Sequence, residues 1–249
     1  MFVKKEINFN KYKERGAYHW QGIGKNVFYS NAFLKARYQM VLNQIPLFKN
    51  KEKVIDIGCG DGALSYLIKT KKGGEISGID PSPEAIKIAQ SKFDKFNVKN
   101  CSFKTGSGYR LPYKDNSFDY AVLADVIEHV NQPEKILKET KRVLKKKGII
   151  VASSVIKSSD IPEDKMHVKE YSANELKNML EKYFDNVKIR KTHNLFLKKI
   201  YQFSLIIGKF KPQIFRYAIN ILTNVFAFNP FVLCSCPKLT CQTLIGVKK

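Results

Sequence analysis

The sequence lacks three features: a long uninterrupted apolar run, a cysteine framework, and any stretch rich in Gly, Ser or Pro. Five cysteines in 249 residues are an odd number and too few for a disulfide scaffold, so we expect a reducing compartment, the cytoplasm. The N-terminal segment MFVKKEINFNKYKERGAYHW contains no signal-peptide apolar core. Without a linker or an internal repeat, a single domain with one substantial core is expected.

Acidic residues are also scarce, and they are absent from one end. Residues 186–249 contain eleven Lys or Arg and no Asp or Glu, whereas residues 54–185 contain 22 basic and 19 acidic residues. The whole chain carries a formal charge of +22. Such basic ends favour an anionic neighbour. We expect peripheral contact with an anionic membrane, while nucleic acid and an acidic carrier protein are alternatives; no recognised RNA-binding motif is present.

Apolar runs of strand length alternate with helical patterns through the middle of the chain. Pro83 follows Ser82, a suitable helix N-cap, and Gly148 is expected to cap the helix before it. This alternation predicts an α/β fold with a parallel sheet and helices on both faces, so ligands should bind beyond the carboxyl ends of the strands. The expected strands are 54–57, 75–79, 101–104, 118–123, 149–153 and 187–190, and the expected helices are 63–70, 83–93, 133–144 and 173–183.

Residues 195–233 interrupt the alternation with two apolar stripes at helical spacing, before a last strand near 239–247. This spacing favours two helices that pack on the sheet as a cap. The alternative is a basic amphipathic surface that contacts a membrane or holds an apolar substrate. The stripes are Phe196, Ile200, Phe203, Ile207 and Phe210, followed by Phe215, Ile219, Leu222, Val225 and Phe226.

The segment VIDIGCGDG at residues 54–62 joins the first strand to the first helix of this pattern. Glycines in such a turn allow a ligand to approach the backbone closely. Asp56 and Asp61 would repel a pyrophosphate, but they suit a ligand that carries an ammonium group and a sulfonium. Asp80 closes the next strand, where a carboxylate can accept hydrogen bonds from ribose hydroxyls.

Together these segments resemble the class I S-adenosylmethionine-dependent methyltransferases, and within them methyltransferase type 11 and the ubiquinone-biosynthesis O-methyltransferases. The matching segments are VIDIGCGDG, GIDPS at 78–82, FDYAVLADVIEHV at 118–130, LKKKGIIVAS at 144–153 and HVKEYSANEL at 167–176. The resemblance implies a Rossmann-like, seven-stranded, mostly parallel sheet whose last strand is antiparallel. It also implies one domain: a helical arm or lid (1–50), a cofactor core (51–194), a helical cap insertion (195–236) and a last strand (237–249).

The same resemblance implies that S-adenosylmethionine is the cofactor. Gly58 and Gly60 would contact its methionine part, Asp56 its amino group, and Asp80 its ribose. Ser107 stands where the family often has an aspartate that reaches the adenine amine. The implied cofactor set is Arg37, Asp56, Gly58, Gly60, Asp80, Ser107 and Ala124.

Asp125, Glu128 and His129 have i, i+3, i+4 spacing, which would place them on one face of a helical turn just after the fourth strand. With His167 they could bind Mg²⁺ or another divalent metal. Alternatively, His129, with Glu128, acts as a general base, or these groups only form structural hydrogen bonds.

The predicted activity is methyl transfer from S-adenosylmethionine to a small-molecule, quinone-like, sugar or lipid-linked acceptor. Two alternatives remain: an RNA methyltransferase that uses the basic ends, and a non-catalytic module that keeps the fold. Tyr18, His19 and Trp20 precede the core as an aromatic cluster, which either closes over the ligand or anchors the arm.

Overall fold

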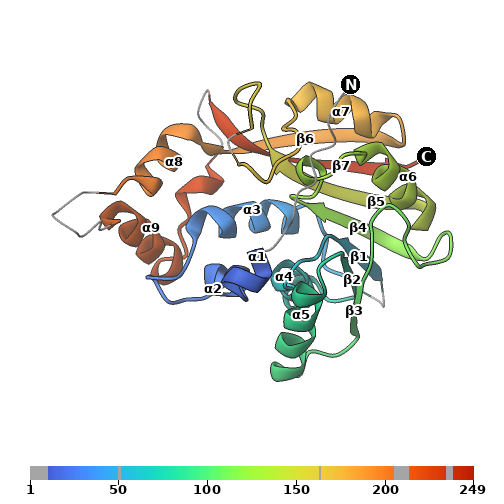
Figure 1. Ribbon diagram of the computed structural model, residues 1–249, viewed down its shortest axis with the longest axis horizontal. Coiled ribbons are helices and arrows are strands. Elements are labelled where there is room, and N and C mark those ends of the chain that lie inside the picture. The colour runs from blue at the N-terminus through green and yellow to red at the C-terminus, as the bar shows by residue number, and fades with distance from the viewer. Residues whose placement is uncertain (1–10, 50–51, 163, 205–212, 234–237) are drawn as a thin grey trace.

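The computed structural model describes residues 11–49, 52–162, 164–204, 213–233 and 238–249. Seven strands form one sheet in the order β3-β2-β1-β4-β5-β7-β6, in which β7 is antiparallel to both neighbours and the other pairs are parallel (Figure 1). The predicted fold class is confirmed. The strands are β1 (Lys53–Ile57), β2 (Glu75–Asp80), β3 (Cys101–Thr105), β4 (Phe118–Ala124), β5 (Leu144–Val155), β6 (Phe184–Asn194) and β7 (Leu239–Lys248).

Helices cover both faces of the sheet, as its apolar strands require. On one face, Leu42, Ile68 and Phe93 of α3, α4 and α5 join a buried cluster with Val54 of β1. On the other face, α6 supplies Leu137 and α7 supplies Leu176 and Leu180 to a second buried cluster. These helices are α3 (Ala32–Leu42), α4 (Ala63–Lys72), α5 (Pro83–Lys95), α6 (Pro133–Val143) and α7 (Ala173–Glu181).

The strand order reverses between β1 and β4, and this reversal positions the site. β1 is hydrogen-bonded to β2 on one side and to β4 on the other. The connections from these strands leave in opposite directions at that point, so their carboxyl ends open a crevice. The glycine loop follows β1, and the segment Asp125–His129 follows β4 at the same edge.

The expected role of Gly148 as a helix cap is wrong. α6 ends at Val143 with Leu144 as its C-cap residue, and β5 begins at Leu144 rather than near residue 149. Gly148 lies within β5, where the register with β4 shifts after Leu144. Lys147 has a φ of +62° there, and a side chain on Gly148 would meet the Lys145 carbonyl oxygen at 2.8 Å. Gly148 therefore allows the strand to shift register at this point, where a larger residue would not fit.

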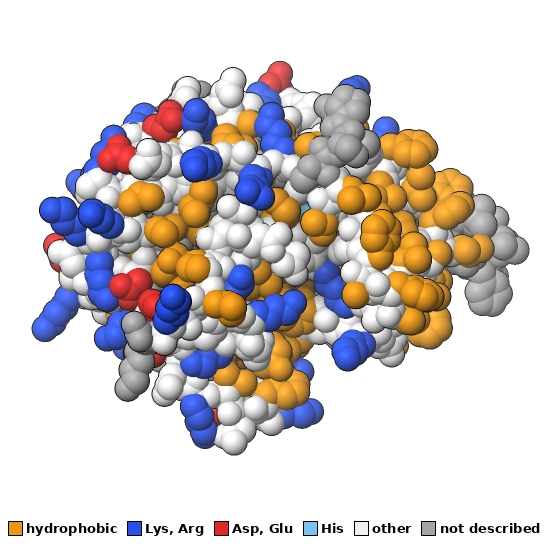
Figure 2. Space-filling model, turned by 180° about the vertical axis from the view of Figure 1, so that it is seen from behind, with side chains coloured by type: hydrophobic (Ala, Val, Ile, Leu, Met, Phe, Trp, Pro, Cys, Tyr) orange, Lys and Arg blue, Asp and Glu red, His pale blue; other side chains and the backbone are white. Residues whose placement is uncertain are grey.

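The insertion between β6 and β7 contains α8 (Leu195–Gln202), α9 (Ile214–Val225) and a short turn, η2 (Pro230–Val232). The expectation that its apolar stripes face the core is wrong for most of the described residues. Phe196, Val225 and Phe226 are about 70 % exposed, and Ile219 is buried. Figure 2 shows hydrophobic side chains gathered at one end of the molecule. Ile207 and Phe210 lie outside the described residues.

The insertion instead packs against the N-terminal arm, which contains α1 (Lys11–Arg15), α2 (Tyr18–Ile23) and α3 (Figure 1). A third, small buried cluster joins α3 to the insertion: Ala32, Ala36, Tyr201, Ile219 and Phe231. Segments from the two ends of the chain thus form one body beside the sheet. Within the described residues, no helix has the length and apolarity that a membrane crossing requires.

Candidate functional site

A cavity of about 430 Å³ lies at the carboxyl edge of β1, β2, β3 and β4. The structure brings all the predicted site residues to its wall, because the carboxyl ends of parallel strands meet at one edge. The predicted cofactor residues on the wall are Arg37, Asp56, Gly58, Gly60, Asp80, Ser107 and Ala124, and the predicted metal or catalytic residues are Asp125, Glu128, His129 and His167.

The glycine loop leaves no room for side chains at two positions. Gly58 has a φ of +74°, and an added Cβ would meet Val126 Cγ2 at 2.5 Å. Gly60 has a φ of +54°, and its Cβ would collide with the hydroxyl of Tyr12. Both glycines are therefore required by backbone conformation and by close packing. Tyr12, from α1, was not identified from the sequence.

Asp80 closes β2 and holds the glycine loop. Its carboxylate accepts one hydrogen bond from the Gly60 amide and another from the Ser82 amide, each at 2.9 Å. Burial raises the pKa of Asp80, although these two amides oppose the rise. A carboxylate oxygen accepts more than one hydrogen bond, so Asp80 retains capacity for ribose hydroxyls.

Asp56, at the end of β1, is almost fully buried. It accepts a hydrogen bond from the Ser65 hydroxyl of α4 at 2.5 Å. Burial raises its pKa to about 7, and nearby Asp80 adds to the rise while Ser65 opposes it. A carboxyl group that resists ionisation in this way is stabilised as an anion when a cationic group binds beside it.

The aromatic cluster before the core anchors the arm to this loop. The Trp20 indole donates a hydrogen bond to the Asp61 carbonyl oxygen at 2.6 Å, and the His19 amide donates one to the Asp61 carboxylate at 3.1 Å. Tyr18 and His19 also line the cavity. Asp61 thus holds the arm over the glycine loop, a role that its position in the sequence does not reveal.

Arg37 of α3 forms an ion pair with Asp125. The pair keeps the pKa of Arg37 above its ordinary value, although burial opposes this. Asp125 has a φ of +58°, so it does not share a helical turn with Glu128 and His129, which lie in the short turn η1 (Ile127–His129). The structure therefore separates Asp125 from the other predicted metal ligands and pairs it with α3.

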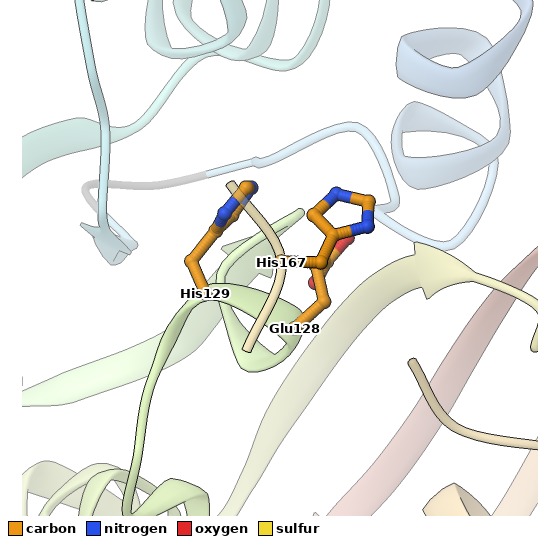
Figure 3. A group of neighbouring side chains, drawn as sticks. All are labelled: Glu128, His129 and His167. Atoms are coloured by element: carbon orange, nitrogen blue, oxygen red, sulfur yellow. The ribbon is translucent and has the colours of Figure 1, made fainter. Parts of the chain in front are cut away.

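Glu128, His129 and His167 do converge, and each offers a ligand atom within 4.8 Å of the others (Figure 3). The backbone explains this, because the Glu128 carbonyl oxygen accepts a hydrogen bond from the Val168 amide at 2.7 Å. The Glu128 carboxylate is fully buried, and no described residue donates a hydrogen bond to either oxygen. Burial first, and then the charge of Asp125, raise its pKa to about 8.

Both histidines have a defined tautomer. His129 Nδ1 lies 2.8 Å from the Met166 carbonyl oxygen, and His167 Nδ1 lies 2.7 Å from a carboxylate oxygen of Glu170. These oxygens accept, so each Nδ1 carries a proton and each Nε2 is directed away from these partners. Burial lowers the pKa of His129, which keeps it neutral. Two imidazole nitrogens and a buried carboxylate without a partner suit a divalent metal.

The sheet order, with an antiparallel β7 between β5 and β6, and a glycine loop followed by an acid at the end of β2, define the class I S-adenosylmethionine-dependent methyltransferase fold. Residues 48–215 match the family model described as a methyltransferase domain. The chain belongs to this family of methyltransferase domains.

Curated relatives match part of the chain. An uncharacterized methyltransferase of Schizosaccharomyces pombe is 33 % identical over 130 residues, which cover 49 % of this chain and 45 % of that protein. Demethylmenaquinone methyltransferase of Thermotoga maritima is 35 % identical over 41 % of this chain and 43 % of its own. Ubiquinone biosynthesis O-methyltransferase of Azorhizobium caulinodans is 30 % identical over 41 % and 40 %. The chain thus matches less than half the length of these relatives.

Among solved structures, phosphoethanolamine N-methyltransferase 2 of Haemonchus contortus superposes with a TM-score of 0.68 at 14 % identity. The superposition covers 98 % of this chain and 60 % of that one. At this identity the likeness concerns the fold alone. Because 98 % of this chain is covered, the aligned region extends over the arm and the insertion as well as the sheet.

Proposed function

We propose that this protein transfers the methyl group of S-adenosylmethionine to a small-molecule or lipid-linked acceptor. The observation that carries the proposal is the placement of buried Asp56 and Asp80 beside the tight glycine loop. These carboxylates suit the ammonium group and the ribose of the cofactor, and they would repel a pyrophosphate. The family to which the chain belongs supports the same conclusion.

The chemistry requires little from the protein beyond alignment, because the sulfonium is already an activated methyl donor. Holding donor and acceptor in line can contribute about 7–11 kcal/mol. A hydroxyl acceptor must also lose a proton, and neutral His129 presents Nε2 as the base. General-base catalysis contributes about 10²–10⁴-fold.

Calorimetry with S-adenosylhomocysteine tests the proposal. Asp80→Ala should weaken binding about 100-fold or more, because two hydrogen bonds to a charged group are lost and the glycine loop is released. Asp80→Asn should lose less, and Asp94→Ala, which removes an exposed carboxylate of α5, should bind as the wild type does. If the wild type binds a dinucleotide and no S-adenosylhomocysteine, the proposal is wrong.

As the alternative to a general base at His129, we propose that Glu128, His129 and His167 hold a divalent metal such as Mg²⁺, which would occupy the His129 Nε2 lone pair. The support is the unpartnered Glu128 carboxylate beside two Nε2 lone pairs. A bound metal would lower the pKa of an acceptor hydroxyl. Thermal unfolding with added Mg²⁺, Mn²⁺ or Zn²⁺ should show stabilisation of the wild type and of Glu84→Gln, an exposed control, but not of Glu128→Gln. Equal shifts for all three proteins would contradict the metal site.

The names of the relatives suggest acceptor classes to test first. Two of the relatives have names that refer to quinones, demethylmenaquinone and ubiquinone. One solved structure contains phosphomonomethylethanolamine. We therefore propose a quinone-like, sugar or lipid-linked acceptor. A methyl-transfer screen of these classes with and without Mg²⁺, with RNA as a further arm, would identify the class.

We also propose that the insertion makes peripheral contact with an anionic membrane in the cytoplasm. Exposed Phe196 and Phe226 lie on a segment, residues 186–249, that carries no acid. Vesicles that contain phosphatidylglycerol should retain the wild type and Leu47→Ser, an exposed control, at low salt. They should release Phe196→Ser/Phe226→Ser. Equal retention of all proteins, or retention by phosphatidylcholine alone, would contradict anionic contact.

A further inference from the structure

A second cavity, of about 480 Å³, lies between the arm and α9. It adjoins the first cavity, since Tyr18, His19, Leu34 and Arg37 line both. Its other wall is formed by aromatic side chains of residues 28–33 and by Arg216 of α9. Phe28 and Tyr29 are 64 % exposed, so this cavity leads from solvent to the edge of the cofactor site.

The wall of this second cavity is held in place by asparagines of α9. Asn220 is fully buried and donates hydrogen bonds to the carbonyl oxygens of Val27 at 2.8 Å and Ser30 at 2.7 Å. Its own oxygen accepts from the Ala32 amide at 3.2 Å and the Tyr201 hydroxyl at 2.9 Å. All hydrogen-bonding groups of this side chain are therefore used to position the loop. A cavity with such a wall is preorganised for a ligand.

The charge of the second cavity is opposite to that of the first. Its described lining contains two cationic side chains, Arg37 and Arg216, and no carboxylate. Arg37 already forms an ion pair with Asp125. Arg216 donates a hydrogen bond to the Gln213 side chain at 2.9 Å and also interacts with Tyr201, while its Nε is buried with no acceptor among the described residues. A guanidinium placed over the Tyr201 ring, with an unused buried donor, suits an anion.

We propose that the second cavity binds the acidic group of the methyl acceptor, a carboxylate or a phosphate, and that Arg216 is its principal anchor. The aromatic walls would contact the apolar body of the acceptor, and the shared residues would direct its reacting end towards the cofactor. The acceptor is therefore an anionic amphiphile or aromatic acid. This inference rests on the proposed methyltransferase function, and it names the substrate class.

The test uses 1-naphthoate and 1-naphthyl phosphate, which distinguish the two kinds of acid, and neutral 1-naphthalenemethanol. Binding to the full chain is followed by naphthalene fluorescence, with and without S-adenosylhomocysteine. At least one anion should bind about tenfold more tightly than the alcohol, as expected for charge-assisted hydrogen bonds. Arg216→Gln should remove this preference, and Arg216→Lys should retain part of it because the charge stays while the planar fork is lost.

Lys199→Gln is the matched control, since it removes one exposed positive charge from α8 outside both cavities. It should bind the anions as the wild type does, and all variants should keep the wild-type affinity for S-adenosylhomocysteine. Equal binding of the alcohol and both anions, no binding of any anion, or an unchanged preference in Arg216→Gln would overturn the inference. Loss of S-adenosylhomocysteine binding by the wild type would instead refute the proposed function, while the anion titrations would remain interpretable.

Discussion

The two adjoining cavities differ most in the sign of the charged side chains that line them. The cavity at the sheet edge is lined by five carboxylates: Asp56, Asp80, Asp125, Glu128 and Asp164. The cavity under α9 has no carboxylate among its described lining residues, but it has Arg37 and Arg216. Arg37 belongs to both, and its ion pair with Asp125 lies where they meet. The first cavity would thus favour the cationic cofactor, and the second would favour an anionic acceptor.

The cavities also differ in what builds them. The first is formed by the ends of adjacent parallel strands, so any sequence with this topology would place a crevice there. The second forms where α9 is attached to the arm by a buried cluster and by side-chain hydrogen bonds between distant parts of the chain. A change in the contact between α9 and the arm should therefore disrupt the second cavity while the first remains intact.

Asn220→Ala should produce the largest difference between the two cavities in ligand binding. It leaves the Val27 and Ser30 carbonyl oxygens without a donor and the buried Tyr201 hydroxyl without its acceptor, which should cost about 3 kcal/mol in the free energy of unfolding. Chemical denaturation measures this loss. Anion binding should disappear while S-adenosylhomocysteine still binds. Asn131→Ala, which changes an exposed asparagine, should have no effect. Equal loss of both ligands would show that the cavities form one unit.

Gly60→Ala should damage the first cavity instead. A side chain at this left-handed position costs about 1–2 kcal/mol of backbone strain, and its Cβ would also displace the Tyr12 hydroxyl. Gly16→Ala is the matched control, because its φ of +58° is similar but nothing lies within 4 Å of the new Cβ. Calorimetry should show lost S-adenosylhomocysteine binding for Gly60→Ala alone, with partial recovery in Gly60→Ala/Tyr12→Phe. Similar binding by both alanine variants would show that the contact with α1 is unimportant.

The difference between the cavities also explains what the sequence could predict. The glycine loop, Asp80 and the segment around Glu128 are short local patterns, and the sheet topology carries all of them to one edge. The predicted lining residues of the first cavity therefore converge without any knowledge of long-range packing. The glycine spacing and the acid at the end of β2 predict the cofactor loop, whereas Arg37, Ser107 and Ala124 came from the family resemblance.

The second cavity has no such local pattern. Asn220 contacts residues about 190 positions earlier in the chain, Arg216 lines a cavity with residues of that same segment, and no spacing in the sequence encodes that distance. The sequence contains one indication of this cavity, because the polar side chains of Arg216 and Asn220 interrupt the otherwise apolar helix α9. The prediction that Asp125 shares a helical turn with Glu128 and His129 is wrong for another reason. Its i, i+3, i+4 spacing places side chains on one face only in a helical backbone, whereas the φ of Asp125 is positive.

The pH dependence of cofactor binding tests the acidic cavity further. The pKa of Asp56 is about 7 in the folded protein, against 3.8 ordinarily, so the folded protein keeps a proton that the unfolded chain releases between these values. Stability of the ligand-free protein should therefore fall as the pH rises from about 4 to about 7. An ammonium ligand needs the ionised form, so affinity for S-adenosylhomocysteine should rise up to about tenfold from about pH 6 to about pH 8.

Asp56→Asn should remove this rise, and Asp94→Asn should keep it. Calorimetric titrations at both ends of the range measure the change. An affinity for S-adenosylhomocysteine that does not vary with pH in the wild type would mean that Asp56 does not contact the amino group.

The smallest expected effect concerns Ser107, which lines the cavity and accepts a hydrogen bond from the Tyr109 amide at 3.2 Å. If its hydroxyl also accepts from the adenine amine, as the family resemblance implies, Ser107→Ala should weaken S-adenosylhomocysteine binding only about fivefold, because a neutral hydrogen bond contributes about 1 kcal/mol. Ser107→Asp should strengthen binding, since a charged acceptor forms the stronger bond. Ser102→Ala, on β3 and outside the cavity, is the control. Weaker binding by Ser107→Asp would show instead that the hydroxyl only shapes the loop, and that the carboxylates already present repel one more.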